Sequence, residues 1–161
     1  MHPWDRAFLS LRVLCEVLGG GNGLLFQEIR EKQGLCYDIS MTCDTMTGLA
    51  FVQTGVAGKD AKHTASEICR ILQNMADHGI KNNDFQDAVE QIRRKISDIS
   101  DSQWKIMDYV AEQEIIGTNL DSEQMLRRLA DVTVEDVVKA AQKLSLRTMY
   151  ALTGEEEFSW D

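Results

Sequence analysis

Residues 18–37, LGGGNGLLFQEIREKQGLCY, contain the changes of pattern that organise this 161-residue chain. Before them, apolar residues recur at steps of four and three, which predicts an amphipathic helix; they are Trp4, Phe8, Leu11, Cys15 and Leu18. Three glycines, Gly19 to Gly21, predict that this helix ends in a left-handed cap. Asn22 is placed to cap a second helix that buries Leu25, Phe26 and Ile29 and ends at Gly34.

After Gly34 the period changes to two, which predicts a half-buried strand over residues 35–44 with Tyr37 on its apolar face. A second strand over 49–56 completes a hairpin. Helices then follow, one of them with Trp104, Met107, Ala111 and Ile115 on its buried side. Residues 147–153 alternate weakly and predict a last strand. The pattern is that of an α+β fold, a small antiparallel sheet packed by several helices, in one domain over residues 1–161.

The composition limits the classes of function. Acidic residues outnumber basic ones by 26 to 17, and this net charge of −9 repels phosphate backbones, which excludes nucleic-acid binding as the main function. No run of 18 apolar residues is present, so we expect no transmembrane helix and no membrane partner. The four cysteines form no CxxC pair, and the N-terminus lacks the pattern of a secretion signal. We therefore expect free thiols and a cytoplasmic location.

The sequence contains no pattern typical of a metal site or of a phosphate-binding loop. The three histidines lie apart, and neither HExxH nor HxxEH occurs, so no metal ligands and no cofactor site are predicted in this chain. The glycine cluster follows a predicted helix, whereas phosphate-binding glycine loops follow a strand. A tight turn between two helices is the better interpretation of Gly19 to Gly21.

Arg30 and Tyr37 are the residues whose chemistry suggests a site. Arg30 lies in the last part of the second predicted helix and Tyr37 lies near the start of the strand, so the turn at Gly34 brings both toward one rim. A guanidinium and a phenol there suit a peptide carbonyl or a developing oxyanion. Taken on chemistry alone, a solvated Arg30 and a Tyr37 in the core remain the favoured alternative.

Residues 18–37 resemble the segment LGGG-x-SSRLF-x-E-[IV]-REK-x-GL-x-Y of the second, zinc-free domain in the insulinase/pitrilysin family of zinc peptidases, which includes the mitochondrial processing peptidases. The similarity continues in residues 47–58, 131–137 and 150–154, so it spans nearly the whole chain. Asn22-Gly23-Leu24 replaces the family's Ser-Ser-Arg. The family domain also has a strand before the first helix, so the resemblance implies a fragment of a longer protein that lacks this strand.

The resemblance implies a role for the chain as one half of a clamshell closed around a peptide. Arg30 and Tyr37, seven residues apart, match the family's arginine and tyrosine that reach toward the substrate and the catalytic centre. Zn²⁺ and the HxxEH motif belong to a partner domain, so this chain is not active on its own. We therefore predict the non-catalytic half of a zinc metallopeptidase, which walls the substrate chamber and binds peptide.

Two other functions stay open at this stage. One is an inactive homologue that acts as a structural or assembly subunit, as the core proteins of a respiratory complex do within this family. The other is a separate enzyme that uses its cysteines. A thiol titration that finds no cysteine of low pKa would exclude the second alternative.

Overall fold

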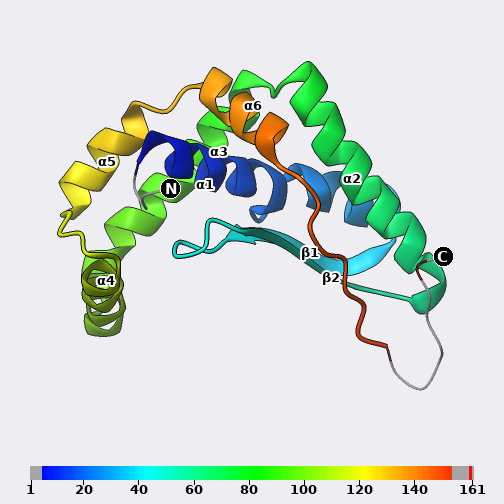
Figure 1. The fold of residues 1–161 in the computed structure, drawn as a ribbon, viewed down its shortest axis with the longest axis horizontal. Helices are drawn as coiled ribbons and strands as arrows, with labels where there is room; N and C mark the ends of the chain where they lie inside the picture. Colours follow the sequence, from blue (N-terminus) through cyan, green and yellow to red (C-terminus); the bar gives the residue numbers. More distant parts are fainter. Residues whose placement is uncertain (1–4, 154–159, 161) are drawn as a thin grey trace.

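The computed structural model describes residues 5–153 and 160. Helices arch over a short hairpin (Figure 1). The elements in chain order are α1 (Arg6–Gly19), η1 (Phe26–Glu31), β1 (Cys36–Cys43), β2 (Ala50–Val56), η2 (Gly58–Asp60), α2 (Ala61–His78), α3 (Asn82–Ser97), η3 (Asp98–Asp101), α4 (Gln103–Ile116), α5 (Ser122–Ala130) and α6 (Val134–Lys143). The predicted α+β class is confirmed.

Helix α1 forms the centre of the core. It packs on β1 on one side and on α3 and α6 on the other, so it is buried on more than the predicted stripe. Leu9, Val13 and Leu14, outside that stripe, are completely buried. Trp4, the first residue of the predicted stripe, lies outside the described residues. The Asp5 carboxylate caps the helix by accepting a bond from the Phe8 amide at 2.9 Å.

Two glycines, Gly19 at the end of α1 and Gly23 in the loop after it, are required by close packing. Gly20 at the helix end has an extended backbone, with φ −63° and ψ 171°, so the predicted left-handed cap is wrong. A Cβ at Gly19 would lie 2.0 Å from the Met41 backbone nitrogen of β1. A Cβ at Gly23 would lie 2.4 Å from the Leu18 carbonyl oxygen. Glycine is therefore required because α1, the loop and β1 approach closely at this point.

The sheet is the predicted antiparallel hairpin. Among the described residues it has two strands, with Ile39 opposite Thr54 and Met41 opposite Val52. Ile39 and Met41 are buried, as the alternation predicts. Tyr37 is 85% exposed, so its predicted place on the apolar face is wrong. The register shifts between Cys36 and Asp38, and such a bulge takes the extra residue out of the alternation.

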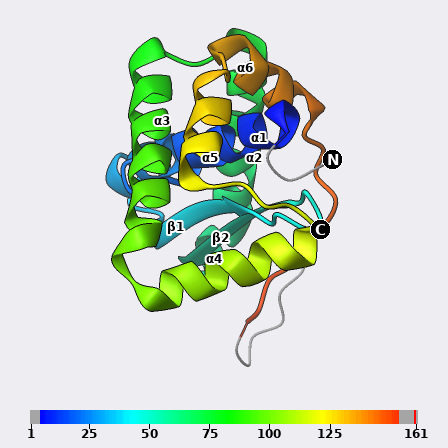
Figure 2. The ribbon, with the colours of Figure 1, turned by 90° about the vertical axis from the view of Figure 1, so that its left-hand side faces the viewer.

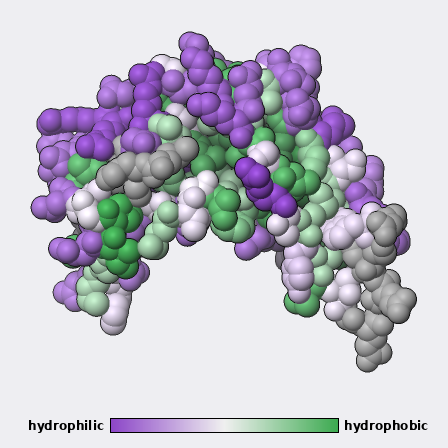
Figure 3. Space-filling view, viewed as in Figure 1, coloured by the Kyte–Doolittle hydropathy of each residue, from purple (hydrophilic) through white to green (hydrophobic). Residues whose placement is uncertain are grey.

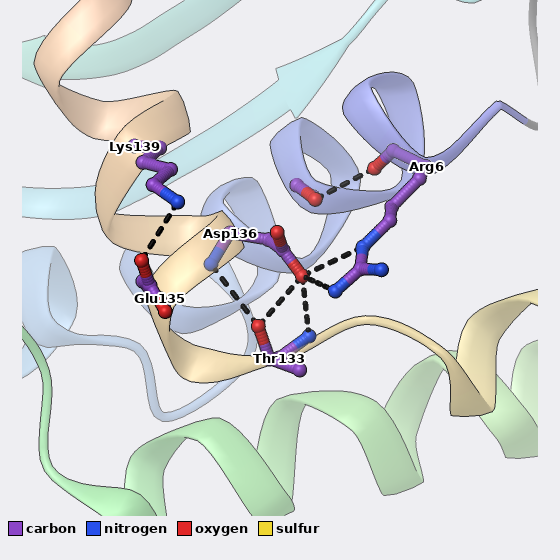
Figure 4. Close-up of polar contacts among 6 residues, drawn as sticks. Arg6, Thr133, Glu135, Asp136 and Lys139 are labelled. Atoms are coloured by element: carbon purple, nitrogen blue, oxygen red, sulfur yellow. Dashed lines mark hydrogen bonds and ion pairs between the residues drawn. The ribbon is translucent and has the colours of Figure 1, made fainter.

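An ion pair between Arg6 and Asp136 joins the first helix, α1, to the last helix, α6 (Figure 4). The Asp136 carboxylate accepts bonds from the Arg6 guanidinium of α1 and from the Thr133 hydroxyl, each at 2.6 Å. Burial alone would raise the pKa of Asp136, but the bonds from Thr133 and Arg6 outweigh it and lower the pKa from 3.8 to about 2. Thr133 and Asp136 also form the capping box that begins α6.

Two further predictions fail for lack of a packing partner. Residues 147–153 form no strand, because no neighbouring strand pairs with them in the described part of the chain. The predicted inner face of α4 is exposed, with Trp104 at 74% and Ile115 at 67%. Figure 2 shows why: α4 runs below the hairpin, away from the helices that form the core.

Candidate functional site

A short π-helix, η1, positions Arg30. Its wider turn is marked by the bond from the Lys32 amide to the Gln27 carbonyl at 3.1 Å, five residues back. Leu25 and Ile29 are completely buried and anchor the segment in the core. Arg30 follows Ile29 directly and therefore lies at the rim of the core, half-buried. Single π-helical turns are often found at functional sites.

The loop after η1 turns the chain sharply into β1. Gly34 has φ +65°, a left-handed conformation that a residue with a side chain adopts only at a cost. The Gly34 amide donates to the Arg30 carbonyl at 3.0 Å, and the Leu35 amide donates to the Ile29 carbonyl at 3.1 Å. No side chain caps the start of η1; instead the Gln27 side-chain amide donates to the Asn22 carbonyl at 2.7 Å, so the predicted Asn22 cap is wrong.

The structure brings Arg30 and Tyr37 together, as the sequence predicts. The Arg30 guanidinium carbon lies 4.5 Å from the centroid of the Phe26 ring and 5.5 Å from that of the Tyr37 ring. The cation therefore stacks against two aromatic rings, which restricts the orientation of its planar fork. In the described part of the chain, neither the guanidinium nor the Tyr37 hydroxyl is engaged by another side chain in a hydrogen bond or ion pair. Both polar groups can bind a ligand.

Side chains from α2 fix the same rim. The Gln33 amide donates to the Glu67 carboxylate at 2.9 Å, and Arg70 binds that carboxylate with two bonds at 2.8 and 3.0 Å. The bonds from Arg70 and then Gln33 lower the pKa of Glu67 from 4.5 to about 2. Glu67 therefore stays charged at neutral pH and holds the loop that separates Arg30 from Tyr37.

The donor groups of the described residues do not fit a zinc ion. No group of three His, Cys, Asp or Glu side chains lies close enough there to hold a metal. His63 is exposed on α2, and the His78 ring contacts the Asn74 carbonyl at 3.2 Å. The Cys15 thiol is hydrogen-bonded to Cys43 and buried, and both effects raise its pKa. Cys15 is therefore a core residue rather than a nucleophile.

The stack includes one residue that the sequence reasoning missed. Phe26 is predicted as a core residue, but it is only half-buried and its ring lies against Arg30. An aromatic residue four positions before an arginine on a helix is the signal that could have indicated this contact.

No helix among the described residues is both long and apolar enough to cross a membrane.

Comparisons with known proteins place these features in a family context. The family model described as the peptidase M16 inactive domain matches residues 1–92. The probable inactive metalloprotease YmfF of Bacillus subtilis is 27% identical over 153 residues, which cover 94% of this chain and 36% of that protein. The uncharacterized zinc protease SCO5738 of Streptomyces coelicolor is 31% identical over 143 residues, covering 86% of this chain and 31% of that protein.

A solved structure shows the same fold. A conserved protein from Enterococcus faecalis superposes with a TM-score of 0.78 at 24% identity, covering 88% of this chain and 34% of that chain. This chain therefore spans about a third of the length of each of these three proteins.

Proposed function

The chain belongs to the peptidase M16 family, through the domain described as inactive, and we propose that it is the zinc-free half of a zinc peptidase. The resemblance in residues 18–37 is thereby confirmed at the level of the family. In this role the domain walls a substrate chamber, and Arg30 and Tyr37 bind the peptide backbone. A partner half that bears HxxEH supplies Zn²⁺ and the attacking water.

The stack of Phe26, Arg30 and Tyr37 is the observation that carries the proposal. An oriented guanidinium next to an exposed phenol offers several N–H donors and one O–H donor at a single rim. Such donors suit a peptide carbonyl, whose oxygen gains negative charge when water attacks it. Because stacking restricts the Arg30 guanidinium before the substrate arrives, its donors need little reorganisation during the reaction.

The hairpin supports an extended peptide as the ligand. Among the described residues, β1 and β2 pair only with each other, so each has an open edge. A peptide in extended conformation can add to such an edge through backbone hydrogen bonds. Tyr37 lies at the start of β1, where an added strand would pass beside it.

Mixing the chain with an HxxEH-bearing half from the same genome tests the proposal. We expect hydrolysis of unfolded peptides by the mixture only. Arg30→Ala should lower kcat/KM about a hundredfold and Tyr37→Phe about tenfold, because each removes a donor to the developing charge. Tyr150→Phe is the matched control, since Tyr150 is 80% exposed and lies in the chain segment after α6. Full activity in both site variants would refute the role of the pair.

A structural subunit is the second candidate, and the name of one relative favours it. That relative, which aligns with 94% of this chain, is described as a probable inactive metalloprotease. In this alternative the Arg30–Tyr37 rim is a remnant of the fold, and the exposed faces bind other proteins. A partner half that itself lacks HxxEH, together with no peptide hydrolysis by the complex, would support this function over the first.

A further inference from the structure

Helix α4 carries an apolar stripe on the side that faces away from the body of the domain. Trp104, Met107 and Ile115 are 74%, 59% and 67% exposed, and Ala111 lies between them. Their spacing of three, four and four residues places them on one face of the helix. We call these four residues the α4 stripe. Gln113, the only buried residue of the helix, lies on the opposite side.

The spacing of these residues predicts a buried helix face, but in the described part of the chain no other element covers it. Helix α4 is attached through η3 and through its side opposite the stripe, where the Tyr109 hydroxyl donates to the Leu120 carbonyl and the Leu120 amide donates to Gln113 Oε1. The three large side chains of the stripe expose on the order of 400 Å², an apolar area typical of binding surfaces on soluble proteins. Figure 3 shows apolar surface at this end of the arch, while the convex outside is hydrophilic.

The charges beside the stripe indicate what can cover it. Asp108 and Glu112 lie along one side of the stripe, and Glu114 lies along the other. Lys105 is the only basic residue of α4. A second copy of this chain would place acidic borders against acidic borders, and an anionic membrane would repel them in the same way. The complementary partner has an apolar groove bordered by Lys and Arg, in the helix-in-groove mode of recognition.

The position of α4 in the domain indicates which protein carries this groove. In both ribbon views α4 lies at or below the hairpin, on the side that α1 does not cover (Figures 1 and 2). This open side is the wall that the proposed function turns toward the other half of the peptidase. We propose that the α4 stripe docks into a basic-bordered apolar groove on the HxxEH-bearing half. The inference rests on the proposed function and adds the surface that joins the two halves.

The test measures the affinity between this chain and the separately expressed HxxEH-bearing half by isothermal titration. Trp104→Ser and Met107→Ser should each weaken binding at least tenfold, since large exposed side chains at an interface centre carry most of the affinity. Asp108→Lys with Glu112→Lys should also weaken it, and most strongly at low salt. Val110→Ser, an exposed apolar position of the same helix off the stripe, is the matched control and should bind as the wild type does.

Several results would overturn the inference. Wild-type affinity in the stripe variants, or no affinity between the unaltered halves, excludes this docking surface. Sedimentation that shows a dimer of this chain which Trp104→Ser dissociates makes a second copy the occupant. Binding to phosphatidylserine vesicles that depends on Trp104 makes a membrane the occupant.

The proposed function is tested separately with the two halves joined by a flexible linker, where turnover no longer depends on docking affinity. An effect of Arg30→Ala on turnover there, with normal binding in the stripe variants, retains the function and rejects the docking surface. The opposite pair of results rejects the function and retains the surface.

Discussion

Gly19→Ala should destabilise the domain strongly, because α1 and β1 meet there without room for a methyl group. The added Cβ would lie 2.0 Å from the Met41 nitrogen, 2.4 Å from its Cβ and 2.5 Å from its Cα. Two of these three atoms belong to the backbone of β1, so no rotation of a side chain can relieve the contact. Either the strand or the end of the helix has to move.

The size of the effect follows from the distance. Ordinary contacts of a Cβ begin near 3.4 Å, so β1 has to retreat by about 1.4 Å from a closely packed core. Forced overpacking of this kind costs about 3 kcal/mol, at the upper end of the usual range. With a urea m-value of about 2 kcal/mol/M, the midpoint of unfolding should fall by about 1.5 M.

Urea unfolding followed by circular dichroism measures this change, and Gly21→Ala supplies the matched control. A Cβ at Gly21 would meet nothing within 4 Å, so this variant should stay within about 0.5 kcal/mol of the wild type. Equal stability of Gly19→Ala and Gly21→Ala would refute the close packing of α1 on β1 and with it the explanation of the glycine cluster.

Three further predictions concern the ion pair and the rim. Asp136→Asn should cost about 1–2 kcal/mol at neutral pH, because the pKa of Asp136 is about 2 in the folded chain, below the ordinary aspartate value of 3.8 that applies to the unfolded chain. That contribution is complete above about pH 5 and is lost as the pH falls through 3.8 toward 2. Urea unfolding near pH 2 should therefore give the same free energy of unfolding for Asp136→Asn and the wild type. A difference in free energy that does not change with pH would contradict this prediction. Phe26→Leu should keep the free energy of unfolding within about 1.5 kcal/mol of the wild-type value. It should also remove the nuclear Overhauser contacts that NMR can record in the wild type between the Phe26 ring and the Arg30 side chain. Gly34→Ala should cost about 1 kcal/mol in urea unfolding because φ is +65°, and an unchanged midpoint would argue against that conformation.

The sequence predicts the elements within and beside residues 18–37 well, because each of them follows from a local pattern. The stripe of α1, the turn at Gly34 and the alternation of β1 depend on neighbours in the chain. The exposure of Tyr37 could not be predicted in this way. It depends on one extra residue in β1 opposite β2, and a strict period of two contains no sign of such a bulge.

Helix α4 shows a second limit of predictions from hydrophobic periodicity. The spacing of Trp104, Met107 and Ile115 correctly indicates an apolar face, but it cannot say whether this chain or another surface covers that face. Residues 147–153 have the same difficulty, since an alternating segment becomes a strand only beside another strand. The family resemblance indicated the pairing of Arg30 with Tyr37, whereas the part played by Phe26 required the structure.

A double-mutant cycle on kcat/KM of the assembled peptidase tests the central claim most directly. The four forms are the wild type, Arg30→Ala, Tyr37→Phe and the double variant, each combined with the HxxEH-bearing half under saturating association. Because the Arg30 guanidinium lies 5.5 Å from the Tyr37 ring, we predict that both single variants lose activity and that the double variant loses less than the two losses combined. Equal kcat/KM in all four forms would contradict the claim that this domain presents the pair to the substrate.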